Sequence, residues 1–127
     1  MGPEAFREPS VTDLPILDPN PLQDLLDLGA GPGLVQELVG LLREDTPARL
    51  AALDGALAAG DAGLAFQEAH QLKGSLGNLG LVRAADLARQ VEGLAREGRV
   101  EAALGTGRAL GKAYEEALAA LQAAFPA

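Results

Sequence analysis

One histidine carries the most informative chemistry of this sequence. His70 is the single histidine among 127 residues, and the chain contains no cysteine, so there is no set of imidazole and thiolate ligands for a metal ion. We therefore expect no metal site. A neutral imidazole is a competent nucleophile near pH 7. Lys73 follows three residues later, so on a helix its ammonium would lie beside the ring and favour an anionic group there, which suits a phosphoryl group.

Small and hydroxyl residues surround this pair. Gly74 and Gly77 would project near His70, although each glycine inside a helix costs about 0.5–1 kcal/mol relative to alanine. Their lack of a Cβ would leave the imidazole open to a bulky reactant; the alternative is that Gly77 only helps to end the helix. Ser75 has two possible partners, a phosphoryl group on the ring or the backbone of its own helix, and spacing does not choose between them.

The helical phase places His70 away from the core. Asp61 is a typical N-cap, and the pattern predicts a helix from there to about Asn78. At about 100° per residue, His70 lies roughly 130° from the centre of the apolar stripe. A lone helical histidine is often a packed core residue, but this periodicity favours an outward-facing one. The core stripe consists of Ala65, Ala69, Leu72, Leu76 and Leu79.

The rest of the chain also indicates helices. Alanine and leucine dominate while β-branched and aromatic residues are scarce, which predicts an all-α protein. Short glycine-containing turns between the amphipathic segments predict an antiparallel four-helix bundle with a short additional N-terminal helix. The expected helices are a short one from Pro21 or Leu22 to Leu28 with Asn20 as N-cap, then residues 33–59, 61–78, 81–97 (with Ala84, Ala88, Val91 and Ala95 inward) and 100–125 (with Ala117, Leu118, Leu121 and Phe125 on one face).

Pro47 lies inside the longest of these tracts. Proline removes a helical hydrogen bond, so either one helix bends there or Asp45 or Thr46 caps a new helix, and the sequence leaves both open. We expect the core-facing stripe of the tract to be leucine: Leu34, Leu38, Leu41 and Leu42, continued by Leu50, Leu53 and Leu57.

Composition limits the domain organisation and the partners. The proline-rich residues 1–16 are expected to be extended or disordered, and residues 17–127 to form one domain. A net charge of −8 disfavours nucleic acid. No apolar run approaches the roughly 18 residues needed to span a bilayer, and the N-terminal residues lack the pattern of a signal peptide. We therefore expect a cytoplasmic protein that binds neither nucleic acid nor membrane.

The segment around the histidine is similar to that of a known family. Residues 70–75 (HQLKGS), followed by 78–80 (NLG), resemble the histidine-containing phosphotransfer (HPt) domain, and the resemblance extends from about Leu17 to Phe125, including residues 17–19 (LDP) and 59–61 (AGD). It implies that His70 accepts a phosphoryl group from a receiver-domain aspartate, or from a partner kinase, and passes it to a response regulator in a two-component phosphorelay. The metal and most catalytic groups would then lie on the receiver.

The resemblance also implies roles and partners. Glu92 would bond the second ring nitrogen of His70; the alternative is a surface glutamate paired with Arg89 or Arg96. Phe66 and Gln67 would belong to the docking surface, unless Phe66 packs under the N-terminal segment. The expected partners are receiver domains of response regulators and of hybrid sensor kinases, bound by a monomer.

The sequence has neither the nucleotide-binding glycine boxes nor the length of a histidine-kinase ATPase domain, so we expect a phosphocarrier without cofactor and without autokinase activity. Two other functions stay open. The first is a non-phosphorylated helical adaptor or inhibitor that binds a sensor kinase or receiver. The second is a phosphatase that acts on receivers.

Overall fold

The computed structural model describes residues 13–126, and these residues form helices connected by short turns, with no strand. The all-α prediction is confirmed. No helix among them is both long enough and apolar enough to cross a membrane. The five helices are α1 (Asn20–Asp27), α2 (Pro32–Ala59), α3 (Ala62–Asn78), α4 (Val82–Arg96) and α5 (Val100–Ala124).

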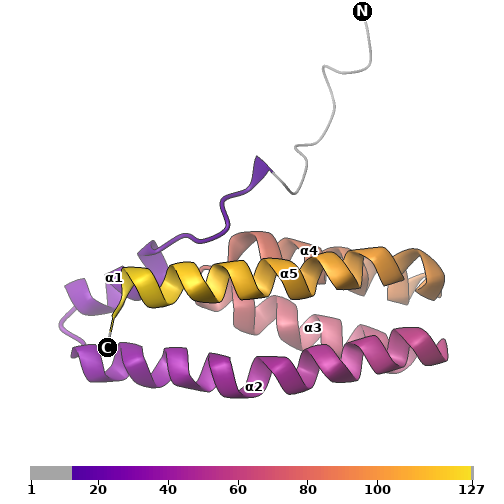
Figure 1. The fold of residues 1–127 in the computed structure, drawn as a ribbon, viewed down its shortest axis with the longest axis horizontal. Helices are drawn as coiled ribbons and strands as arrows, with labels where there is room; N and C mark the ends of the chain where they lie inside the picture. The colour runs from indigo at the N-terminus through magenta and orange to yellow at the C-terminus, as the bar shows by residue number, and fades with distance from the viewer. Residues whose placement is uncertain (1–12, 127) are drawn as a thin grey trace, which may run out of the picture.

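The four long helices, α2 to α5, lie side by side as an antiparallel bundle, and the short α1 sits at one end, beside the C-terminus (Figure 1). The most extensive contact is between α3 and α4, followed by the contact between α4 and α5. This arrangement confirms the predicted four-helix bundle with an additional N-terminal helix. Its largest fully buried side chains are Leu22, Leu53, Leu72, Leu76, Leu81, Leu110, Leu121, Val35 and Val91.

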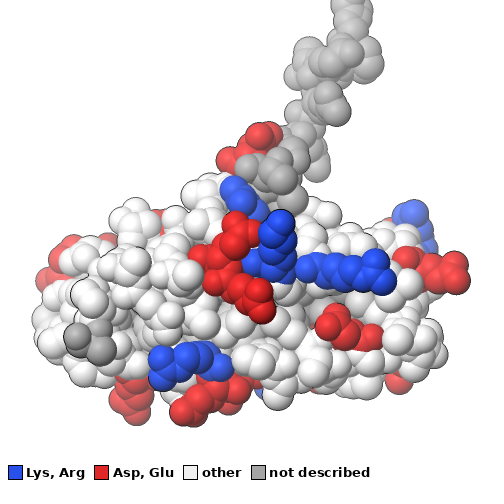
Figure 2. All heavy atoms as spheres, in the orientation of Figure 1, with Lys and Arg blue, Asp and Glu red and all other residues white. Residues whose placement is uncertain are grey.

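The outer surface mixes charges of both signs. On the face where α5 and α2 are visible, Lys and Arg lie next to Asp and Glu (Figure 2). This face therefore presents no continuous basic patch of the kind that binds a phosphate backbone.

Helix α2 continues through Pro47 without a break, which settles the question that the sequence left open. Thr46 is 2% exposed and belongs to the core-facing side, so it caps no new helix. The predicted leucine stripe is wrong at two of its first four positions. Leu34 and Leu41 are 43% and 49% exposed, whereas Leu42 is buried and Leu38 packs half-buried against the core; Val35 and Val39, which were not predicted, are also buried.

The reason is the helical period. Val35, Val39, Leu42 and Thr46 repeat at intervals of three and four residues and lead on to Leu53. The stripe that starts at Leu34 reaches the charged Asp45 instead.

One predicted helix start is confirmed and another is wrong. At α3, the Asp61 carboxylate accepts a hydrogen bond from the Leu64 amide at 3.0 Å, as an N-cap does. At α1, Asn20 is not the cap but the first helical residue. Its amide donates to the Asp18 carboxylate at 3.0 Å, so the aspartate two residues earlier performs the capping role.

The segment before α1 lies against α3 and α4. Ile16 and Leu17 pack on the core, and the Arg83 guanidinium donates to the Leu14 carbonyl at 2.7 and 3.1 Å. The Asp18 amide donates to the Gly80 carbonyl at 2.7 Å, which ties the segment to the turn between α3 and α4. The expectation of disorder for residues 1–12 lies outside the described residues.

We expect Gly80→Ala to destabilise the fold strongly. Gly80 has φ +87°, a conformation that costs an L residue about 1–2 kcal/mol, and a Cβ there would collide with the Asp18 carbonyl oxygen. Urea denaturation should show a loss of about 3 kcal/mol or more in the free energy of unfolding. Gly98→Ala is the control, because Gly98 has φ +74° but open space around its Cα. Equal losses in the two variants would contradict the proposed collision.

Candidate functional site

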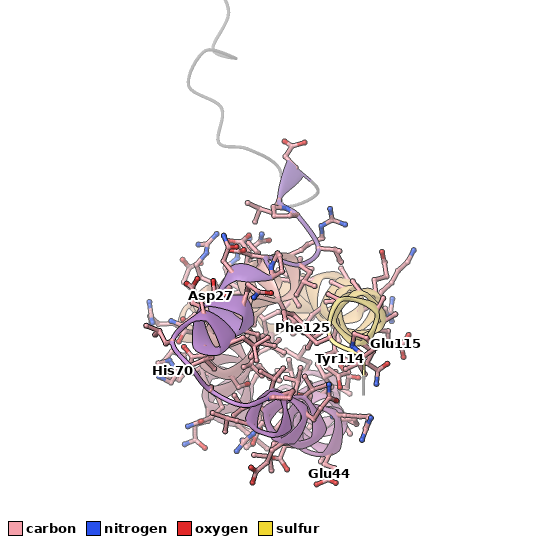
Figure 3. All side chains as sticks on the ribbon, turned by 90° about the vertical axis from the view of Figure 1, so that its left-hand side faces the viewer. Asp27, Glu44, His70, Tyr114, Glu115 and Phe125 are labelled. Atoms are coloured by element: carbon pink, nitrogen blue, oxygen red, sulfur yellow. The ribbon has the colours of Figure 1, made fainter. Side chains whose placement is uncertain are left out.

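His70 lies on the outer side of α3. Its side chain is 57% exposed, whereas Ala65, Ala69, Leu72 and Leu76 of the same helix are fully buried. Viewed along the bundle, His70 sits at the outer edge of the ring of helices, while Tyr114 and Phe125 point toward its interior (Figure 3). The predicted phase of α3 is therefore confirmed, with Leu79 as a half-buried end of the stripe.

Glu92 of α4 contacts both His70 and Lys73 of α3. Its side chain is only 5% exposed, and its two carboxylate oxygens bind different partners on α3. Oε2 lies 2.5 Å from His70 Nδ1, and Oε1 accepts a hydrogen bond from Lys73 Nζ at 2.8 Å. The alternative partners do not bind it: Arg89 pairs with Asp86, and the Arg96 guanidinium lies over the Phe66 ring.

This contact determines the tautomer of the imidazole. An ionised carboxylate only accepts hydrogen bonds, so the proton of the neutral ring resides on Nδ1 and points at Glu92. The lone pair of the other nitrogen, Nε2, is then free. The tautomer that Glu92 stabilises is therefore also the one in which Nε2 is unprotonated and can act as a nucleophile.

The charge state of Glu92 follows from a balance of opposing effects. Burial raises the pKa of the carboxyl, but the hydrogen bonds from Lys73 and His70, together with their charges, outweigh burial and lower the pKa below its ordinary value of 4.5. Glu92 therefore remains ionised at neutral pH even though it is buried.

Phe66 adds a second restraint on the ring. The phenyl ring of this half-buried residue stacks on the imidazole one turn later, with 6.0 Å between the centroids and 12° between the planes. The Arg96 guanidinium lies 5.3 Å from the Phe66 centroid. Phe66 was predicted to belong to a docking patch and not to stack on the imidazole, although the spacing of four residues on one helix was the signal for the stack.

The predicted docking and glycine positions also lie on α3. Gln67 and Gly74 are exposed on α3, and a Cβ at Gly74 would meet no atom within 4 Å. At Gly77, a Cβ would meet only the Ala85 methyl group at 3.7 Å. Packing within the protein therefore requires neither glycine, and both an open approach to His70 and, for Gly77, a role in ending the helix remain possible reasons.

Ser75 lies on another side of α3. Its hydroxyl donates to the Leu72 carbonyl at 3.4 Å, which is the helix-bonded alternative. It also lines a cavity of about 310 Å³ with Leu41 and Asp45 of α2, whereas Glu92 approaches His70 from α4. The structure thus brings His70, Lys73, Glu92 and Phe66 together and places Ser75 toward a different helix. Among the described residues, no cluster of three potential ligands for a metal ion occurs.

Comparison with known proteins gives a consistent result. Residues 37–124 match the family model described as the Hpt domain. Among solved structures, histidine-containing phosphotransfer protein B (HptB) from Pseudomonas aeruginosa PAO1 superposes with a TM-score of 0.75. The two chains are 27% identical, and the match covers 87% of this chain and 95% of the other. Comparison with curated protein sequences gave no match.

We expect the Lys73→Met variant to raise the pKa of Glu92. The substitution removes a hydrogen bond and a positive charge and leaves the burial, which favours the neutral carboxyl. NMR titration of the Glu92 side-chain carbonyl should give a midpoint below 4.5 in the wild type and a higher midpoint in the variant.

A lowered pKa in the folded state also has a consequence for stability. The contribution of Glu92 is present at neutral pH and is lost as the pH falls through its folded-state pKa, so the wild type loses stability at lower pH than the variant does. Arg99→Met, which removes an exposed cation paired with Glu97, is the control. An unchanged midpoint in Lys73→Met would show that Lys73 does not set the charge state of Glu92.

Proposed function

The chain belongs to the Hpt domain family, and we propose that it is a phosphorelay intermediate whose His70 takes a phosphoryl group from the aspartyl phosphate of one receiver domain and passes it to the aspartate of another. The family places the chain in histidine phosphotransfer. The acceptor residue, the donor and the recipient are the proposed part. A partner kinase is the other possible donor.

The observation that carries the assignment to His70 is the geometry of its ring. The imidazole is 57% exposed, its Nδ1 is bound to a buried carboxylate, and its Nε2 has no hydrogen-bond partner within residues 13–126. A histidine that served only packing would be buried, and one that only bound a surface carboxylate would not need Phe66 against its ring. The combination is typical of a positioned nucleophile.

The transfer step balances as follows. The Nε2 lone pair attacks the phosphorus of the aspartyl phosphate, an N–P bond forms, and the P–O bond to the aspartate breaks, so that the carboxylate leaves with the bond electrons. The proton on Nδ1 stays in place, and the ring becomes a positively charged phosphoimidazole. The Glu92 carboxylate in contact with Nδ1 stabilises that charge as it develops. The return step reverses each of these changes.

Lys73 contributes a second charge to the site. Its ammonium is held 2.8 Å from Glu92 Oε1, one helical turn from His70 on the same face of α3, and its side chain is 36% exposed. From there it can interact with the phosphoryl oxygens, whose negative charge a cation stabilises. In this role Glu92 is a positioning residue for both side chains.

The surrounding surface is the proposed docking site for receivers. Phe66 and Gln67 lie one turn before His70, and Gly74 lies one turn after it with open space at its Cα. The lack of a side chain at Gly74 leaves space beside the imidazole for the receiver's aspartate to approach. We propose that the chain is a phosphocarrier that obtains its phosphoryl group only from other proteins and does not phosphorylate itself from ATP.

We expect His70→Gln to abolish phosphotransfer. When the wild type is incubated with a phosphorylated receiver domain, label should move onto this chain in an acid-labile, base-stable form, as a phosphoramidate requires. The variant should remain unlabelled, because glutamine supplies no nucleophilic nitrogen, and circular dichroism should show an intact bundle since the side chain is exposed.

Three results would contradict the proposal. Persistent label in His70→Gln would place the acceptor elsewhere. Release of free phosphate by the wild type without a labelled intermediate would indicate a phosphatase. Receiver binding without transfer in either direction, and unchanged in His70→Ala, would indicate an adaptor.

We expect Glu92→Gln to slow transfer about 10- to 100-fold, because the neutral amide oxygen accepts a weaker hydrogen bond from Nδ1–H than the carboxylate does and does not stabilise the positive charge of the phosphoimidazole. Receiver affinity should stay within about threefold of the wild type, since Glu92 is only 5% exposed and offers little surface to a partner. Rapid-quench measurement of transfer and calorimetric titration separate the two quantities. Glu97→Gln, at the exposed end of α4, is the matched control. Lost affinity with a normal transfer rate would assign Glu92 to docking.

A further inference from the structure

Arg96, near the end of α4, makes a contact to which the proposed transfer step gives no role. Its guanidinium carbon lies 5.3 Å from the centroid of the Phe66 ring. The Arg96 side chain is exposed, and within residues 13–126 it forms neither an ion pair nor a hydrogen bond. The aromatic ring is therefore the group in this part of the chain that orients the guanidinium.

The contacts of Arg96 and Glu92 with α3 have the same registry. The helices α3 and α4 run antiparallel and make the most extensive contact of the bundle (Figure 1). Glu92 contacts His70. Four residues further along α4, Arg96 contacts Phe66, which lies four residues before His70 on α3. Residues four apart share a helix face, so the packing that brings Glu92 to the imidazole also brings Arg96 to the phenyl ring.

The bond to Glu92 alone does not fix the plane of the imidazole. It holds Nδ1, but a hydrogen bond tolerates departures of about 30° from linearity, and the terminal torsion of a histidine has a broad minimum. Tilting of the ring changes the direction of the Nε2 lone pair. Because phosphoryl transfer depends mainly on positioning, a contact with the face of the ring contributes to the reaction.

Phe66 supplies this face contact, since its ring is within 12° of parallel to the imidazole. Phe66 is only half-buried, so the core holds only part of its ring. Arginine is suited to hold the remainder, because its planar guanidinium stacks on aromatic faces and stays charged at physiological pH. Arg96 thus gives Phe66 a partner on a second helix.

From these contacts, and resting on the proposed function, we propose that Arg96 is a positioning residue for phosphotransfer that acts through Phe66 on the plane of the His70 ring. Helix α4 then holds the imidazole in two ways, directly through Glu92 and indirectly through Arg96. Arg96 does not touch the reacting atoms. An exposed cation–π contact is weak, so its expected contribution to the transfer rate is about two- to fivefold.

The first experiment observes the ring by NMR without any phosphoryl transfer. In the wild type, nuclear Overhauser effects should connect the ring protons of Phe66 and His70, and Arg96→Ala should weaken them and shift the imidazole signals. Spectra at about pH 9 exclude changes of imidazole protonation. Arg99→Ala is the control, since Arg99 is an exposed cation paired with Glu97 just beyond α4. Unchanged signals in Arg96→Ala would overturn the proposal.

The second experiment is a double-mutant cycle on the transfer rate, with a receiver domain at saturating concentration. Arg96→Ala should slow transfer about two- to fivefold, and Phe66→Leu at least as much. Because Arg96 acts through Phe66, adding Arg96→Ala to Phe66→Leu should cause no further loss. Losses that multiply in the double variant would show that Arg96 acts independently of Phe66 and would overturn the proposal.

Receiver affinity separates positioning from docking. Calorimetry should give the same Kd within twofold for the wild type and Arg96→Ala, because the proposed role concerns the ring and not the partner. Weaker binding with a normal rate at saturation would assign Arg96 to receiver binding instead.

Failure of the proposed function gives a different result. If His70 is not the phosphoryl acceptor, the wild type takes up no label, while the NMR signals of the ring still change in Arg96→Ala. If only the role of Arg96 is wrong, the wild type and Arg96→Ala transfer at the same rate and the imidazole signals do not change.

Discussion

A buried carboxylate is stable only when its charge is compensated, and Glu92 meets this condition with a different partner on each oxygen. The His70 ring binds Oε2 and the Lys73 ammonium binds Oε1, so no acceptor of this 5% exposed side chain is left without a donor. Removing one partner of such a group is generally more destabilising than the pair is stabilising, since an uncompensated charge remains in a poorly solvated position. The arrangement therefore constrains His70, Lys73 and the relative position of α3 and α4 at the same time.

That position depends on small side chains. Ala65 and Ala69 of α3, and Ala84 and Ala88 of α4, are completely buried. The distance between packed helices is set by the side chains at their contact, so alanines allow a close approach. A glutamate on α4 then reaches the outward-facing side of α3. The Gly80 turn completes the arrangement, since it sets where α4 starts and also binds Asp18. The alanine content of the chain is thus directly related to its chemistry.

The parts of the fold that were predictable from sequence are those with a single strong pattern. The core stripe of α3 has no competitor, and its phase sufficed to place His70 outside. In α2 a valine stripe from Val35 and a leucine stripe from Leu34 run side by side, and only contact with the other helices selects the first. The pairing of Lys73 with Glu92 was not predictable because it depends on the registry of two helices. The choice of Ser75 between two acceptors likewise depended on three-dimensional context.

The shared carboxylate also explains how one site can both accept and donate, on the proposed function. Phosphorylation makes the imidazole positive, which strengthens its contact with Glu92, while the new phosphoryl oxygens compete with Glu92 for the Lys73 ammonium. Charge is thus redistributed among three groups already in contact, with no ion to be brought in from solvent. A cation without a partner in the unphosphorylated protein would stabilise the phosphorylated state much more than the unphosphorylated one. Because Lys73 has a partner in both states, the difference is smaller, which favours transfer in both directions.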